Sequence, residues 1–296
     1  MPERRFLDPA AVARIQGLQL KAMTVVEGFL TGLHQSPYHG FSVEFAEHRP
    51  YMPGDTLRHL DYKVLGRTGR YYIKQYEEET NLKAYILIDH SGSMGYGSGD
   101  STKLDYGSAL AASLALLLLR QRDAVSFVTF AETLTSILPP RSAMGWIETL
   151  VAELEKLKPE GKTGIASALF DTAERVKRRG LVVLISDLLD EPDRIMAGMK
   201  AIRHVGHELM VFHILDPLEK SFAFPRDARF QDMETDNVMP SRPWHIRDEY
   251  QREMESFIEA YRQHCRNNRI DYKLFTTDTP YEIALFEFLV RRKRLV

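Results

Sequence analysis

The residues best suited to chemistry follow an apolar run in the stretch "AYILIDHSGSM". The run ends on Asp89, and two hydroxyls follow at alternate positions, Ser91 and Ser93. Alternate residues of an extended segment point to the same side, so we expect these three side chains to face one point. A carboxylate and hydroxyls are oxygen ligands of the kind that hard divalent cations prefer. The stretch is therefore a candidate metal site.

Two more oxygen-bearing side chains stand at comparable positions further along the chain. The segment "EGKTGIASAL" places Thr163 just before a predicted helix, and "LISDLLD" places Asp187 at the end of another apolar run. Functional groups of open parallel sheets gather at the carboxyl ends of the strands. If these runs are strands of one such sheet, Thr163 and Asp187 join Asp89 and the two serines at one edge.

Five such oxygens favour magnesium, which takes oxygen ligands in near-octahedral geometry and keeps some of its water. Mn²⁺ and Ca²⁺ are the alternatives. Only Asp89 and Asp187 of the five ligands can carry a negative charge, so the ion would have far fewer anionic ligands than in an acid-rich calcium loop. An open coordination position would then attract an Asp or Glu carboxylate from a partner, which indicates a metal that serves binding.

The elements needed to position these residues are visible in the apolar patterning. Continuous apolar runs alternate with helical segments, which is typical of a doubly wound, mostly parallel α/β sheet covered on both faces. The predicted strands cover 83–89, 124–130, 181–187, 208–215 and 271–277. The predicted helices cover 9–33, 103–121, 143–157, 165–178, 191–204, 247–267 and 280–292.

Two regions do not follow this alternation. We predict that residues 1–80 form an N-terminal helix and a β-rich extension, and that 81–296 form the main α/β domain. A second β-rich segment interrupts that domain near 217–245 and is a candidate to pair with the region before residue 80. Short apolar stretches between turn-forming residues are the basis of both assignments.

Composition excludes several classes of function. The chain of 296 residues has a net charge of −2, so it lacks the basic excess of a general nucleic-acid or membrane-surface binder. One cysteine, Cys265, excludes an internal disulfide and a cysteine zinc site. No apolar run has the length of a membrane span, and the first residues lack a signal-peptide pattern. We expect a cytoplasmic protein without a membrane span.

Two familiar catalytic motifs are approached but not matched. A phosphate-binding loop ending at Gly161–Thr163 would need glycine where Lys156 stands. A nucleophile elbow centred on Ser93 would need glycine where Ser91 stands. Neither motif supports an enzyme, and we expect none.

The five oxygen-bearing residues carry a family resemblance. Asp89, Ser91 and Ser93, with Thr163 and Asp187 downstream, resemble the metal-ion-dependent adhesion site of von Willebrand factor A domains. The resemblance implies an α/β fold, a divalent ion held by these residues, and a protein partner that supplies a carboxylate.

The upstream segment "HRPYMPGDTLRHLDYKVLGRTGRYYIKQYEEE" narrows the resemblance. It is similar to the signature of a bacterial family catalogued as domain of unknown function 58, which carries such a domain. Tyr62 stands where tryptophan is commoner. The family resembles adaptors of MoxR-type AAA+ ATPases, which implies such a partner. The matching positions are Arg49, Pro50, Tyr51, Pro53, Gly54, Asp55, Arg58, Asp61, Arg67, Gly69, Lys74 and Glu77 to Glu79.

Within this signature, charged residues have two interpretations. Arg49, Asp55 and Arg58 could present a polar binding surface. Alternatively, Arg49, Asp55, Arg58 and Asp61 form an ion-paired network that fixes the extension to the main domain. We favour the structural interpretation.

Two rival functions stay open at this point. A metal-dependent phosphohydrolase would use the same ion to polarise a phosphate and activate water. His90 is the one evident general base beside the site, and it is otherwise a solvated loop residue or a contact for a partner. The other rival is a purely structural protein with an empty site. The plainest alternative for the motif itself is that Asp89 and its serines only cap a helix.

Overall fold

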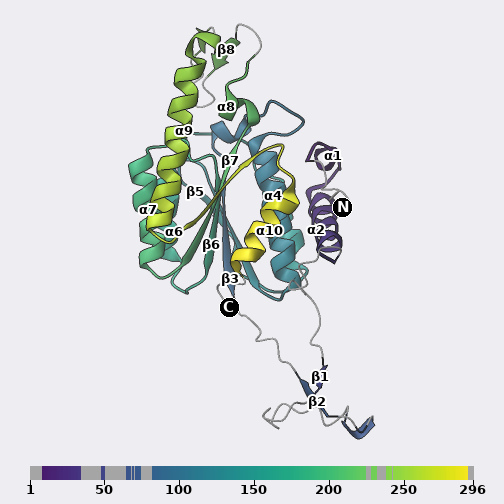
Figure 1. Ribbon diagram of the computed structural model, residues 1–296. Helices are drawn as coiled ribbons and strands as arrows, with labels where there is room; N and C mark the ends of the chain where they lie inside the picture. Colours follow the sequence, from purple (N-terminus) through teal and green to yellow (C-terminus); the bar gives the residue numbers. More distant parts are fainter. Residues whose placement is uncertain are drawn as a thin grey trace.

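A central sheet of six strands organises the molecule. The computed structural model describes residues 9–34, 48–50, 65–67, 69, 71–74, 82–224, 228–231, 238–241 and 243–292. The strand order is β10-β7-β6-β3-β4-β5, and every neighbouring pair is parallel except β4 and β5 (Figure 1). This confirms the predicted mostly parallel α/β fold. The strands are β3 (Lys83–Asp89), β4 (Ala124–Phe130), β5 (Leu134–Ile137), β6 (Leu181–Ser186), β7 (Glu208–Leu215) and β10 (Asp271–Thr276).

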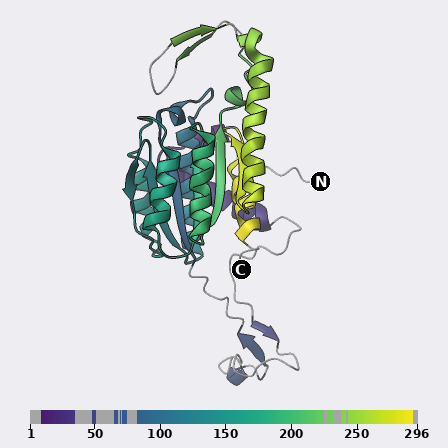
Figure 2. The ribbon, with the colours of Figure 1, turned by 90° about the vertical axis from the view of Figure 1, so that its left-hand side faces the viewer.

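Helices cover both faces of this sheet (Figures 1 and 2). One face packs against α4 (Lys103–Arg120), α5 (Trp146–Leu154) and α10 (Tyr281–Arg292). The other face packs against α6 (Ile165–Arg175), α7 (Pro192–His204) and the long α9 (Pro243–Asn267). The two helical layers explain why the central strands β3 and β6 are mainly apolar, because neither face of the sheet is left to water there.

The central strand β3 shows how the sequence serves both layers. Ala84, Ile86 and Ile88 belong to the core on the α4 side. Tyr85 and Leu87, which alternate with them, belong to the core on the α6 and α7 side. Side chains of a strand point to opposite faces in turn, so an unbroken apolar run is what a doubly covered strand requires.

Helix α4 is enclosed on all sides. Every residue from Tyr106 to Leu119 is buried, including the polar Ser113. The sheet covers one side of α4, and α2 (Leu18–His34) and α10 pack on its outer side. Helix α2 thus adds an outer layer beyond the two that enclose the sheet (Figure 1).

Several element boundaries differ from the sequence-based predictions. The expected helix over 9–33 is two helices, α1 (Pro9–Ala13) and α2, and Gly17 between them adopts a φ of +83°. Strand β5 was not predicted, and it is the one antiparallel strand of the main sheet. The region after Asp216 opens with a short helix, α8 (Pro217–Ser221), and α9 begins at Pro243 instead of 247.

Two small hairpins stand apart from the main sheet. Strand β1 (His48–Pro50) pairs with β2 (Tyr72–Lys74), and β8 (Ala228–Gln231) pairs with β9 (Val238–Ser241), both antiparallel. The described strands before residue 80 therefore do not pair with those after residue 217, contrary to expectation. The predicted domain boundary at 80/81 stays a prediction.

Most of the upstream signature lies outside the described residues. This applies to Tyr51 through Asp61, to Tyr62 and to Glu77 to Glu79, and the side chains of Arg49 and Lys74 lie outside as well. The expected network of Arg49 with the charged residues at 55, 58 and 61 therefore stays a prediction. Among the helices of the described ranges, none is both long and apolar enough to cross a membrane.

Candidate metal site

The ends of β3 and β6 lie side by side, as the sequence predicts. The register pairs Ile88 with Ile185, so Asp89 and Ser186 close two neighbouring parallel strands. The Ser186 hydroxyl donates a hydrogen bond of 2.7 Å to Asp89 Oδ2. Asp187 follows Ser186 directly, which brings the two predicted anionic ligands to one edge of the sheet. A hydroxyl that sequence reasoning missed, Ser186, joins them.

Asp89 is a fully buried carboxylate with neutral donors only. Its Oδ1 accepts a hydrogen bond of 2.9 Å from the Ser91 backbone N–H, and Oδ2 accepts the bond from Ser186. Across the described residues, no Lys, Arg or His forms an ion pair with it. Burial and the negative charge of Asp187 raise the pKa of Asp89 from 3.8 to about 7, although the hydrogen bonds oppose this shift.

The two predicted serines line the same loop. Their hydroxyl oxygens lie 3.2 Å apart, and the Ser93 hydroxyl also contributes a hydrogen bond to Asp187. Ser91 precedes a short 3-10 helix, η2 (Gly92–Gly95), but its side chain makes no capping bond there. Helix α4 is capped instead by Thr102 and Asp105, which form a reciprocal capping box. The serine hydroxyls are thus free of the capping role that was the plainest alternative.

Thr163 lies in a loop that is bonded to the serine loop. The Glu160 N–H donates to the His90 carbonyl oxygen, and the Gly92 N–H donates to the Gly161 carbonyl oxygen, both at 3.0 Å. Gly164 then fits so closely against the end of β4 that a Cβ atom there would overlap the Glu132 carbonyl oxygen. These contacts hold the half-buried Thr163 at the same edge of the sheet.

Asp187 has a partner that the sequence analysis did not anticipate. The Lys103 ammonium, at the first residue of α4, lies 2.7 Å from Asp187 Oδ2 and 2.7 Å from Glu219 Oε1 in α8. The side chains of Lys103 and Asp187 are both fully buried. Burial by itself would raise the pKa of Asp187, but the charge and hydrogen bond of Lys103 hold it below its usual range.

A signal for Lys103 does exist in the sequence. Lys103 opens an almost entirely apolar helix, where a positive charge opposes the helix dipole. A cation at the start of a buried helix needs a local anion, but 84 residues separate it from Asp187. Only the fold reveals which carboxylate provides it.

His90 does not face this cluster as a free base. Its Nε2 lies 2.9 Å from the Thr135 hydroxyl and its Nδ1 lies 3.2 Å from the Lys158 carbonyl oxygen. The residue is 3% exposed, so the expectation of a solvated loop histidine is wrong. Both ring nitrogens hold neighbouring loops together.

The donors fit a hard cation in part. Asp89 is a buried carboxylate without a cation, and the two serine hydroxyls stand beside it, which is the chemistry that Mg²⁺ or Mn²⁺ would satisfy. Asp187 is already engaged by Lys103. No group of three or more His, Cys, Asp or Glu side chains in the described ranges could hold a metal, so hydroxyl or water oxygens would have to complete a ligand set here.

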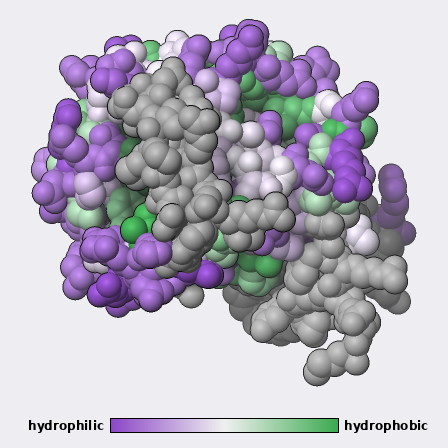
Figure 3. Space-filling model, turned by 90° about the horizontal axis from the view of Figure 1, so that it is seen from above, coloured by the Kyte–Doolittle hydropathy of each residue, from purple (hydrophilic) through white to green (hydrophobic). Residues whose placement is uncertain are grey.

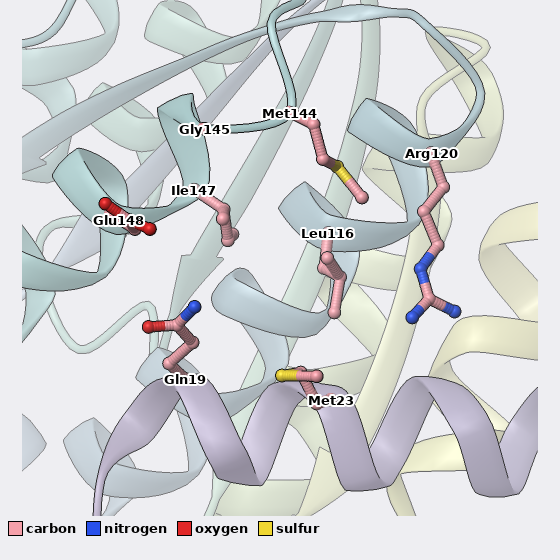
Figure 4. Close-up of a pocket in the computed structure, with 8 residues that line it drawn as sticks. All are labelled: Gln19, Met23, Leu116, Arg120, Met144, Gly145, Ile147 and Glu148. Atoms are coloured by element: carbon pink, nitrogen blue, oxygen red, sulfur yellow. The ribbon is translucent and has the colours of Figure 1, made fainter.

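A pocket of about 260 Å³ lies elsewhere, between α2, α4 and α5 (Figure 4). Met23, Leu116, Met144 and Ile147 point into it and make it largely apolar. Leu116 stands three turns or more along α4 from Lys103, so this pocket is separate from the strand-end cluster.

Figure 3 looks onto the end of the molecule that carries α8 and the carboxyl ends of the strands. The rim of this face is mainly hydrophilic, and hydrophobic areas between are small and interrupted. Leu189, two residues after Asp187, is 38% exposed.

Solved structures with similar folds include two of related architecture. One is a conserved hypothetical protein BatB from Bacteroides thetaiotaomicron, with 18% identity, 72% of this chain and 99% of that chain covered, and a TM-score of 0.46. Another is the SpRpn10 VWA domain, with 13% identity, 45% and 75% coverage, and a TM-score of 0.35. Both similarities are too low to carry an inference about function.

Sequence comparison gives the clearer result. An uncharacterized protein of Mycobacterium tuberculosis is 25% identical over 290 residues, covering 97% of this chain and 91% of the relative. The model of the family described as "Protein of unknown function DUF58" matches residues 47–258. This span is more than half of the chain and includes both the upstream signature and all five predicted ligands. The chain therefore belongs to the DUF58 family.

Proposed function

We propose that this chain is a metal-dependent protein-interaction domain. Asp89, Ser91 and Ser93 would hold a divalent cation, magnesium in the first place, with Thr163 and Asp187 completing its surroundings. When bound, the ion supplies an open coordination position for an Asp or Glu carboxylate of a partner protein. The α/β fold and family membership are consistent with an interaction or adaptor role.

One observation carries the proposal. Asp89 is fully buried, yet no cationic side chain of the described residues neutralises it. A buried unpaired carboxylate costs several kcal/mol, so its retention beside two hydroxyls is best explained by a ligand that is a cation. The raised pKa of Asp89 expresses the same unmet demand for positive charge.

Binding is favoured over phosphoester hydrolysis by the surroundings of the site. Hydrolysis would need a base to activate water, and His90 was the candidate for that role. Its ring nitrogens lie against Thr135 and the Lys158 carbonyl oxygen instead. We therefore propose a function in recognition, and the family resemblance points to a MoxR-type AAA+ ATPase as the partner.

Calorimetric titration tests the metal site. We expect Mg²⁺, and then Mn²⁺, to bind the wild-type protein with one ion per chain and not to bind Asp89→Ala. Asp193→Asn, an exposed acid in the first turn of α7, is the matched control and should bind as the wild type does. Equal binding by wild type and Asp89→Ala would place the ion elsewhere and end the proposal.

Co-purification tests the partner. We expect an AAA+ ATPase to be retained by the wild-type chain in Mg²⁺ and lost in excess chelator or with Asp89→Ala. Retention that is the same in chelator would contradict a metal-bridged contact. Failure to recover any AAA+ ATPase under either condition would contradict this choice of partner and leave the metal titration to be judged separately.

A further inference from the structure

Lys103 bridges the carboxylates of Asp187 and Glu219 beside the strand-end cluster, and these three residues form an ion triad. The Lys103 ammonium donates hydrogen bonds of 2.7 Å to each of the two carboxylates. The lysine and Asp187 side chains are fully buried, whereas that of Glu219 is 18% exposed. A buried ammonium is tolerated only where anions surround it closely, so this lysine is fixed in place.

The triad directly engages one of the predicted metal ligands. Asp187 Oδ2 accepts from Lys103, and Asp187 Oδ1 accepts from the Leu189 backbone N–H at 3.2 Å. Both carboxylate oxygens of Asp187 therefore already accept hydrogen bonds before any ion binds. An arriving divalent cation must share Asp187 with a positive charge that is already there, and the two cations repel each other.

We propose that Lys103 is a resident cation that sets the affinity of the metal site: it partly neutralises Asp187, weakens binding of the divalent ion, and lets the site stay folded without metal. This inference rests on the proposed metal site. Glu219 has the opposite role, because it offsets part of the charge of Lys103.

Formal charges give the direction of each effect. With all groups ionised, Asp89, Asp187, Glu219 and Lys103 carry a net charge of −2, which one divalent ion balances. Removing the ammonium raises the negative charge that attracts the ion, and removing the Glu219 charge lowers it. Metal affinity should therefore move in opposite directions in the two variants.

The position of Glu219 is itself held by the loop after η2. Glu219 Oε2 accepts from the Asp216 N–H at 2.9 Å, and the Asp216 carboxylate accepts from both the N–H and hydroxyl of Ser98. The Lys103 N–H donates to the Tyr96 carbonyl oxygen. The geometry of α8 relative to the site is thus defined, and a Gln at 219 can keep part of the same bonding.

The test is calorimetric titration of Mg²⁺ into wild type, Lys103→Met, Glu219→Gln and Lys200→Met. We expect Lys103→Met to bind Mg²⁺ about tenfold more tightly or better, and Glu219→Gln to bind a few-fold more weakly. Lys200→Met, which removes an exposed lysine of α7, should match the wild type. Thermal unfolding with and without Mg²⁺ is the second readout, and Lys103→Met should show the larger metal-induced rise in Tm.

The outcomes separate this inference from the proposed function. Equal Mg²⁺ affinity in wild type, Lys103→Met and Glu219→Gln would overturn the role of Lys103 and leave the metal site standing. Binding by Lys103→Met but not by wild type would support the resident cation and overturn metal dependence of the native chain. Absence of binding in all variants at millimolar Mg²⁺ would overturn both. If Lys103→Met folds only with Mg²⁺, the inference is supported, and if it never folds, Glu219→Gln decides.

Discussion

Asp89 and Asp187 are the same residue type at neighbouring strand ends, and both are fully buried, yet their environments are opposite. Asp187 has the Lys103 ammonium at 2.7 Å. Asp89 has neutral donors instead, the N–H and hydroxyl of Ser91 and the hydroxyl of Ser186. The pKa of Asp89 is accordingly raised to about 7 by burial and the neighbouring charge, whereas Lys103 holds that of Asp187 below its usual range.

Burial alone therefore does not determine the pKa of a carboxylate. Helix α4 places the Lys103 ammonium next to Asp187, and no cation of the described residues lies next to Asp89. Asp187 has a cationic partner in the folded chain, whereas Asp89 has none among the described residues. A site built this way can be folded and still hold unmet demand for positive charge.

The pH dependence of stability gives the largest expected effect that tests this difference between Asp89 and Asp187. Because the pKa of Asp89 is raised from 3.8 to about 7 by folding, the folded protein keeps a proton between those values that the unfolded chain releases. The free energy of unfolding must then fall as the pH rises through this window, by as much as about 4 kcal/mol. Asp89→Asn should remove this fall. Urea unfolding in chelator from about pH 4 to 8, compared between the two proteins, measures it.

Equal pH profiles for wild type and Asp89→Asn would show that the charge of Asp89 is already compensated. In that case Asp89 and Asp187 would both be compensated by positive charge in the folded protein.

The variant Asp187→Asn tests how much the paired carboxylate contributes to stability. It leaves the buried Lys103 with Glu219 alone, and removing one partner of a buried pair typically costs about 3 kcal/mol or more. We expect a loss of that size in the free energy of unfolding, measured by urea titration at pH 7 without metal.

A surface ion pair supplies the control for this loss. Arg14 and Asp100 lie 3.3 Å apart, with side chains 77% and 51% exposed. Solvent screens such a pair, so Arg14→Ala should change stability by about 0.5 kcal/mol or less. A loss in Asp187→Asn no larger than that would mean that the buried pair contributes little.

Gly164→Ala tests the loop that carries Thr163, where Gly164 packs against the chain just after β4. The added methyl group would overlap the Glu132 carbonyl oxygen, so the loop carrying Thr163 must shift. We expect a loss of about 2 kcal/mol in stability and weaker Mg²⁺ binding in the same calorimetric titration. Gly145→Ala, where an added Cβ meets no atom within 4 Å, is the control. Unchanged Mg²⁺ binding in Gly164→Ala would remove Thr163 from the site.

The sequence predicts the parts of this fold that depend on continuous patterns. The apolar runs ending at Asp89 and near Asp187 identify β3 and β6, because strands covered on both faces are apolar at nearly every inner position. The short strand β5 lacks that signal. Its four residues alternate between half-buried and exposed, since it pairs at an edge of the sheet.

The candidate site was predictable where its residues mark strand ends, and unpredictable where it depends on pairing at a distance. Ser186 contacts Asp89 and Lys103 contacts Asp187, but the sequence around Ser186 or Lys103 does not indicate which residue each one contacts. Helix α8, which carries Glu219, starts with a capping box in a segment whose short apolar stretches and prolines favoured strands and turns. The hydrogen bond that Lys103 donates to Glu219 is visible only in the assembled fold.

The enclosure of α4 has a consequence for how this cluster can lose its structure. Lys103 begins a helix whose residues from Tyr106 to Leu119 are all buried between the sheet, α2 and α10. We expect the buried part of this helix to open only together with the surrounding core, because its amides are enclosed by that core. Lys103 is therefore anchored with the stability of the whole domain. Helix α8 has no buried residue within its span, so it is the side of the triad that local opening can reach first.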